Sequence, residues 1–143
     1  MKAWIKAIFF LNSKLGNLLD SIQDEMDVLS KNLILETFTL CDKMLKLEDK
    51  KRRICNLKVL HSLFKSKLSN IEYNLIKKHL LQGKTFEEIS ATLTKSKSQL
   101  SRDYCKALDK CEEVSIAMTF SEERLEREYK DIILVYKTVK KFR

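Results

Sequence analysis

The sequence predicts an all-α protein, and three observations lead to that prediction. The chain of 143 residues has no proline and only two glycines, so strands joined by tight glycine turns are not favoured. Leucine, lysine and glutamate are abundant, which is typical of long helices. Apolar residues recur at spacings of three and four in several stretches, and that is helical periodicity.

Residues 1–67 are expected to form amphipathic helices that pack together or dimerise. One apolar row alternates at spacings of four and three, as in a heptad seam: Ile8, Leu11, Leu15, Leu18 and Ile22. We expect this row to join two copies in a homodimer, and the alternative is that it is buried inside one subunit. A second amphipathic helix is expected to have an apolar row through Ile34, Phe38, Cys41 and Leu45. After the charged stretch from Glu48 to Arg53, which marks either a turn or a solvated helical section, a second row resumes the pattern: Ile54, Leu57, Leu60 and Phe64.

Residues 68–111 contain signals for the starts of three short helices. A hydroxyl residue is followed three positions later by glutamate or glutamine in three pairs: Ser69 with Glu72, Thr85 with Glu88, and Ser96 with Gln99. This is the spacing of a capping box, in which two side chains satisfy free backbone amides at a helix start. The pairs predict helices over about 70–82, 86–93 and 97–111, and Gly83 can end the first of them in a left-handed conformation.

Residues 112–143 are expected to hold a long amphipathic C-terminal helix. Ser121 is its predicted N-cap, with Phe120 and Leu125 at the spacing of a hydrophobic staple. The predicted apolar row follows the same alternation of four and three: Leu125, Tyr129, Ile132, Tyr136 and Val139.

The formal net charge of +8 is concentrated in the middle of the chain. Residues 50–111 carry 15 basic and 5 acidic side chains, whereas residues 1–49 carry 6 and 8, and residues 112–143 carry 7 and 7. A basic block between near-neutral blocks is typical of a polyanion-binding module flanked by packing elements. A solvated lysine-rich surface would give the same counts.

A set of residues in the segment 68–111 follows a known pattern: Leu68, Ser69, Glu72, Leu75, Ile76, Leu81, Gly83, Thr85, Glu87, Glu88, Ile89, Leu93, Ser96, Leu100, Arg102, Ala107 and Leu108. In these residues the segment resembles region 4 of bacterial sigma factors and the related helix-turn-helix of response regulators. The order of elements also resembles small phage-encoded sigma-like regulators of the autolysin-regulator type. The resemblance implies a helix-turn-helix DNA-binding unit over 68–111, between an N-terminal packing region and the C-terminal helix.

The segment departs from the family pattern in two places. The turn between the second and third helices has Thr94 and Lys95 where the family has glycine and an apolar residue, and Ser90 replaces the usual alanine. A β-branched residue at positive φ is costly, so the turn is expected either to have another geometry or to carry about 1–2 kcal/mol of strain.

The third predicted helix is expected to lie in the major groove of double-stranded DNA. Its inward positions are predicted to be Leu100, Tyr104, Ala107 and Cys111. Six residues on or near its outward face are candidates for contacting DNA: Lys97, Ser98, Gln99, Ser101, Arg102 and Lys106. Glutamine pairs with adenine and arginine with guanine, and lysine neutralises phosphate. Four further lysines complete the candidate surface: Lys77, Lys78, Lys84 and Lys95.

The expected function is therefore that of a sequence-specific transcriptional regulator of prokaryotic or phage origin, reading the groove with residues 97–106 as a homodimer. Two alternatives remain open. One is a protein-interaction module that contacts RNA polymerase, and the other is the small subunit of a phage DNA-packaging machine. An enzyme is disfavoured because the sequence has no glycine-rich phosphate loop, no HExxH and no GxSxG.

No cofactor or metal is expected, because the four cysteines form no CxxC pair and the two histidines do not complete a zinc-finger pattern. The cysteines are expected to be reduced and mostly buried. The longest apolar run near the start, residues 7–11, is too short to span a bilayer. We expect a soluble, unprocessed, cytoplasmic protein.

Overall fold

The computed structural model describes residues 1–32, 34 and 36–143, and all regular structure in these residues is helical. The elements follow one another as α1 (Lys2–Ser30), α2 (Thr37–Lys67), α3 (Asn70–Ile76), the π-helical turn η1 (Lys77–Leu81), α4 (Phe86–Ser90), α5 (Lys97–Ala117), α6 (Glu122–Tyr129) and α7 (Ile133–Lys141). The all-α prediction is confirmed for the described part of the chain. Among these described helices, none combines the length and the apolar composition needed to cross a membrane.

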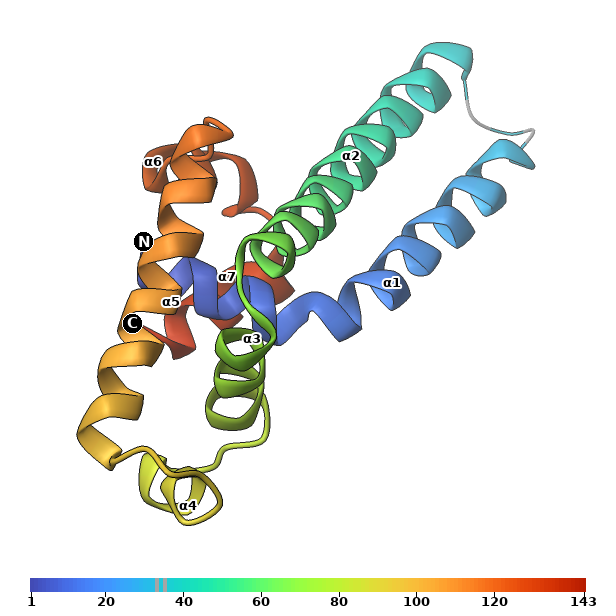
Figure 1. The fold of residues 1–143 in the computed structure, drawn as a ribbon. Coiled ribbons are helices and arrows are strands. Elements are labelled where there is room, and N and C mark those ends of the chain that lie inside the picture. Colours follow the sequence, from blue (N-terminus) through green and yellow to red (C-terminus); the bar gives the residue numbers. More distant parts are fainter. Residues whose placement is uncertain (33, 35) are drawn as a thin grey trace.

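The two longest helices, α1 and α2, form a hairpin whose far end projects from the rest of the molecule (Figure 1). The first half of α1 lies in the core, where it packs against α2, α5 and α7. The row predicted as a dimer seam is used inside the chain: Ile8, Leu11, Leu15 and Ile22 are buried, and Leu18 is half-buried. A homodimer, which remains a proposal, therefore needs another surface.

The first part of the apolar pattern predicted for this region is wrong, because Phe38, Cys41 and Leu45 point away from α1. The second part is confirmed, because four residues of α2 are buried: Ile54, Leu57, Leu60 and Phe64. Phe38 is 77% exposed, Leu45 is 69% exposed and Cys41 is also exposed. The cause lies farther along the helix, where Ile54 and Leu57 are fully buried in the core. A helix anchored on that face turns the row of Phe38 and Leu45 outward.

The predicted long C-terminal helix is also corrected: it is interrupted after Tyr129 and resumes at Ile133. The interruption coincides with a contact from α2, because Arg53 donates hydrogen bonds to the Asp131 carboxylate and to the carbonyl oxygen of Glu128. The Tyr129 hydroxyl in turn donates to the carbonyl oxygen of Arg53 at 2.6 Å. Most of the predicted apolar row is nevertheless buried: Leu125, Tyr129, Ile132 and Val139.

All four cysteines are free thiols, but the expectation that most of them are buried is wrong. Cys41 and Cys105 are exposed, Cys55 is half-buried and only Cys111 is buried. Burial raises the pKa of the Cys111 thiol to about 12, so this thiol is inert at neutral pH. Buried residues from all seven α-helices of the described chain form one continuous core.

Candidate nucleic-acid interface

The candidate surface is formed by α3, η1, α4 and α5, which pack on one another below the hairpin (Figure 1). All four predicted inward residues of α5 are buried: Leu100, Tyr104, Ala107 and Cys111. Ile89 of α4 is buried against them, whereas Leu93, four residues further along the chain, is 44% exposed. The inner side of this unit is thus closed by α5 and left partly open beside Leu93.

The three predicted helix starts are present, and the caps differ in detail. Ser69 and Glu72 form a complete capping box, with backbone-to-side-chain hydrogen bonds of 3.2 and 3.1 Å. The hydroxyl groups of Thr85 and Ser96 accept hydrogen bonds of 3.2 Å from the backbone amides of Glu88 and Gln99, respectively. The side chains of Glu88 and Gln99 do not bond back to the amides of Thr85 and Ser96, so these two capping boxes are incomplete. These hydroxyl groups still satisfy one free amide at each helix start.

The first helix of the unit ends one residue earlier than predicted, in the π-helical turn η1. Gly83 follows with φ +68°, the left-handed conformation expected of it. The amide of Lys84 then donates to the carbonyl oxygen of Lys78 at 3.1 Å, which closes the end of the helix. The π-helical turn η1 and Gly83 together change the direction of the chain before α4 begins.

An aromatic cluster that the sequence analysis missed holds η1, α4 and α5 together. The rings of His79 and Phe86 stack with centroids 4.1 Å apart and an interplanar angle of 11°. Tyr104 of α5 meets both rings edge-on, at 4.8 and 5.7 Å. The Nδ1 atom of His79 lies 2.8 Å from the carbonyl oxygen of Lys84, and because a carbonyl only accepts, Nδ1 carries a proton.

No sequence signal identifies this cluster, because its members come from three elements at unrelated spacings. It matters for the site because it fixes the orientation of α5 from the inner side, through Tyr104. Burial raises the pKa of the Tyr104 phenol to about 12, so the ring stays neutral.

The turn between α4 and α5 is not a left-handed glycine turn. Among the described residues, only Gly83 and Thr119 have positive φ, so neither Thr94 nor Lys95 carries the strain that a left-handed turn would impose. The amides of Thr92 and Leu93 donate to carbonyl oxygens three residues earlier, each at 3.2 Å. The turn therefore starts as a tightened continuation of α4.

The first two turns of α5 present the exposed part of the candidate surface. Lys97, Ser98 and Arg102 are exposed, and Ser101 is half-buried. Cys105, one turn beyond Arg102, lies on the same outer face, and it was missed although its spacing of three from Arg102 predicts that position. Lys97 pairs with Glu87 of α4 at 3.0 Å.

Gln99 does not occupy the outward position expected of a base-reading residue. It is half-buried, and its Nε2 donates to the Asp103 carboxylate at 2.8 Å. The spacing of four places Asp103 one turn further on the same side of α5, so the side chain has a partner within its own helix. Gln99 is better described as a residue that positions Asp103.

The candidate lysines fall into two groups. Lys95 pairs with Asp103 at 2.9 Å, as Lys97 does with Glu87. Within the described chain, five candidate cations have no ion-pair partner: Lys77, Lys78, Lys84, Arg102 and Lys106. All of these except the half-buried Lys78 are exposed.

The basic block extends well beyond this unit. Residues 50–67 of α2 carry 7 basic and no acidic side chains, whereas residues 68–111 carry 8 and 5. Part of the charge on α2 is neutralised, since Arg53 pairs with Asp49 and Asp131 and Arg52 pairs with Asp49. In residues 68–111 basic side chains outnumber acidic ones only by 8 to 5, so the positive charge available to a ligand is carried by the lysines and the arginine that have no ion-pair partner among the described residues.

In comparisons with known proteins, no family model, no curated protein and no solved structure matches this chain.

Proposed function

We propose that this protein is a sequence-specific DNA-binding regulator in which α4, the following turn and α5 act as a helix-turn-helix. One observation carries the proposal: the first two turns of α5 expose Lys97, Ser98 and Arg102 while Leu100 and Tyr104 hold the opposite face in the core. A helix that is fixed on one side and presents short polar and cationic side chains on the other suits the major groove.

The proposed roles follow from the chemistry of each side chain. Arg102, without an ion-pair partner among the described residues, is the group proposed to read a base, because a guanidinium pairs bidentately with guanine. Ser98, on the preceding turn, can contact a base or a phosphate. The start of α5 adds free backbone amides and the positive end of the helix dipole.

Lys77 and Lys84 are proposed to bind the DNA backbone on the side of η1. Both are exposed: Lys77 is the first residue of η1, and Lys84 lies in the segment that joins η1 to α4. A lysine bound to phosphate releases a condensed counterion, which strengthens binding to every sequence alike. These residues would position the protein on DNA while Arg102 selects the site.

Two copies are proposed to bind together, because one helix-turn-helix contacts few base pairs. The surface between copies lies outside the heptad row of α1, which is already buried. A prokaryotic or phage setting, with RNA polymerase as a second partner, forms part of the proposal through the resemblance of residues 68–111 to sigma region 4.

The test is a selection of bound sequences from random duplex DNA by the full chain, followed by titration of the selected site. Arg102→Ala should weaken the selected site by about 1–3 kcal/mol and leave binding to random DNA almost unchanged. Arg127→Ala is the matched control, since Arg127 is an exposed arginine on α6.

A second pair of variants, Lys77→Ala with Lys84→Ala, should weaken binding to all sequences alike. The dependence of log affinity on log salt should become shallower by roughly 0.9 for each phosphate that is no longer neutralised. If the selection yields no preferred sequence, or if Arg102→Ala behaves as Arg127→Ala does, α5 does not read the major groove.

A protein-interaction role is favoured by one observation, the outward row of α2 formed by Phe38, Cys41 and Leu45. Exposed apolar side chains grouped on one helix mark surfaces that bind other proteins. Retention of RNA polymerase subunits by the full chain, abolished in a Phe38→Glu variant while DNA binding persists, would assign this row to polymerase.

A further inference from the structure

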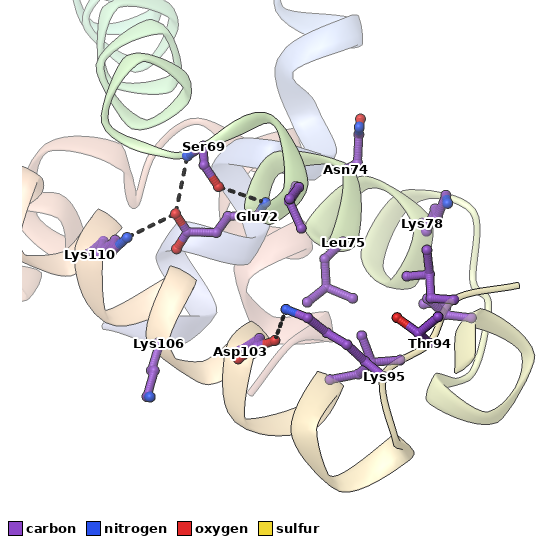
Figure 2. A pocket seen from close by; sticks show the side chains of 14 residues that line it. Ser69, Glu72, Asn74, Leu75, Lys78, Thr94, Lys95, Asp103, Lys106 and Lys110 are labelled. Carbon is purple, nitrogen blue, oxygen red and sulfur yellow. Dashed lines mark hydrogen bonds and ion pairs between the residues drawn. The ribbon is translucent and has the colours of Figure 1, made fainter. Parts of the chain in front are cut away.

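A pocket of about 540 Å³ lies between α3, the turn after α4, and α5. Its floor and walls are apolar, formed by Ile71, Leu75, Ile89, Leu93 and Leu100. Figure 2 shows Leu75 near its centre, with Glu72 and Lys110 on one side and Lys78 and Thr94 on the other. Ligand sites have volumes of about 300–1,000 Å³ and mostly apolar walls, so this pocket has the dimensions of a small-molecule site.

The apolar wall is incomplete in the structure as it stands. Ile71 is 70% exposed and Leu93 is 44% exposed, although both line the pocket. Covering such side chains with an apolar group stabilises by about 25 cal/mol for each Å² removed from water. The pocket thus has apolar surface left to bury, next to fully buried residues such as Leu100.

The rim of the pocket is positively charged. Four lysines and two carboxylates line it: Lys78, Lys95, Lys106, Lys110, Glu72 and Asp103. Both carboxylates are already engaged, because Lys110 pairs with Glu72 at 2.8 Å and Lys95 pairs with Asp103 at 2.9 Å. Within the described chain, the ammonium groups of Lys78 and Lys106 have no ion-pair partner.

We propose that this pocket binds an amphipathic organic anion, with the apolar body against Leu75 and Leu93 and the anionic group at the lysine-lined rim, where Lys78 lies on one side and Lys106 on the other (Figure 2). Each lysine has a flexible four-carbon side chain, so its ammonium group can turn toward a ligand at the rim. A neutral apolar ligand would leave this excess of positive charge unused. A cationic ligand would be repelled.

The shape of the pocket favours a compact ligand over a partner helix. The Lys95 side chain extends from the turn to Asp103 across the pocket, and the Lys110–Glu72 pair lies at one end (Figure 2). An amphipathic helix docks along an open groove with contacts spread over several turns. Here these two ion pairs would have to open before a helix could lie along the pocket.

One consequence of the ligand rests on the proposed function. Lys78 and Lys106 belong both to the pocket and to the candidate DNA surface. An anion bound to them competes with DNA phosphate, so ligand and DNA should each weaken the binding of the other by the same factor. The pocket would then give the regulator a chemical input.

The experiment uses decanoate as the probe and the full chain without DNA, with binding followed by calorimetry. Lys78→Gln with Lys106→Gln should weaken decanoate binding roughly fivefold through the loss of two partly screened charges. Lys77→Gln with Lys84→Gln is the matched control, because both lysines are exposed and neither lines the pocket. This control should bind decanoate as the parent does.

Two further measurements locate the site and identify the ligand class. Leu93→Trp should fill the pocket and abolish decanoate binding while the helical circular dichroism of the chain is retained. Decanol, which has the same chain without the charge, should bind more weakly than decanoate. The proposal is overturned if decanol binds equally well, if the two lysine pairs behave alike, or if an acidic amphipathic peptide binds more tightly and displaces decanoate.

Measuring duplex-DNA binding alongside decanoate binding distinguishes failure of this inference from failure of the proposed function. Decanoate binding by a chain that retains no duplex DNA would support the pocket and refute the DNA-binding role. DNA binding without decanoate binding would refute the pocket alone. If both bind, added decanoate should lower the affinity for DNA, and an unchanged affinity would overturn the competition.

Discussion

Arg53 and Asp131 join α2 to the turn before α7 through two parallel hydrogen bonds of 2.6 and 3.1 Å. The hydrogen bond from Arg53 holds the pKa of the Asp131 carboxyl below its usual range. The guanidinium also reaches the carbonyl oxygen of Glu128, so one side chain satisfies the end of α6 and the turn that follows it. The helix that follows this turn, α7, packs against α1.

Asp131→Ala should lower the free energy of unfolding by about 1 kcal/mol, measured by urea denaturation. A bidentate arginine contact is stronger than an ordinary surface ion pair, but Asp131 is 67% exposed and solvent screens the charge. Asp42→Ala is the control, because Asp42 forms an exposed pair with Lys46 within α2 and should lose only about 0.3 kcal/mol. Equal losses in the two variants would mean that the turn does not depend on Arg53.

The His61→Phe variant should lose less unfolding free energy than wild type when the pH is lowered slightly below neutral. Burial, with a contribution from the charge of Lys65, lowers the pKa of His61 below 6.5. The unfolded chain therefore takes up a proton before the folded protein does, and the unfolding free energy falls as pH decreases from 6.5 through the folded-state pKa. Phenylalanine suits the site because His61 packs edge-on against Phe9 at 5.3 Å.

The measurement is urea denaturation of wild type and His61→Phe at about pH 7.5 and about pH 5.5. Wild type should lose more stability between the two pH values than the variant. A pH dependence that is the same in both proteins would rule out His61 as its source.

Thr119→Gly should raise the unfolding free energy by about 0.5–1 kcal/mol. Thr119 has φ 64°, a conformation that is costly for a β-branched residue and natural for glycine. The substitution removes an exposed hydrogen bond of 2.9 Å from Arg124 to the threonine hydroxyl, which offsets part of the gain. Thr94→Gly is the control: its φ is not positive, so glycine there should destabilise. Stabilisation of both variants, or of neither, in thermal unfolding would contradict the prediction.

Leu15→Ala should cost about 3 kcal/mol of stability, whereas Leu45→Ala should cost less than about 0.5 kcal/mol. Leu15 is fully buried among α1, α2 and the core, and Leu45 is 69% exposed on the outer face of α2. Thermal unfolding at several protein concentrations provides the measurement. A loss for Leu45→Ala that grows with protein concentration would instead show that the outer face of α2 joins two copies.

The sequence predicted the local features of the central unit well, because they depend on neighbours in the chain. Ser69, Thr85, Ser96 and Ser121 all cap helices where expected, and Gly83 has the expected positive φ. Side chains that satisfy their own helix ends act over three or four residues, so their spacing is visible in the sequence. The inward face of α5 was predicted for the same reason, since helical periodicity alone determines it.

The candidate site was less predictable, because its charges and aromatic contacts come from separate elements. Gln99 was expected to face DNA, but Asp103 binds its side chain. The stack of His79 on Phe86 and the Lys110–Glu72 pair join residues of different helices, so their spacing in the sequence does not predict that they meet. Such contacts depend on how helices are placed, and one sequence does not contain that information.

By itself the sequence determined that the chain is helical, where most of its helices begin, and which face of α5 is buried, since each of these follows from interactions within one or two helical turns. Only the tertiary structure decided which of two apolar rows of α2 faces the core, and that the C-terminal helix breaks at Asp131. Either row of α2 could have been buried on amphipathic grounds. Burial of Ile54 and Leu57 in the shared core fixes the rotation of α2 about its axis. Because α2 is one continuous helix, the row of Phe38 and Leu45 then faces solvent.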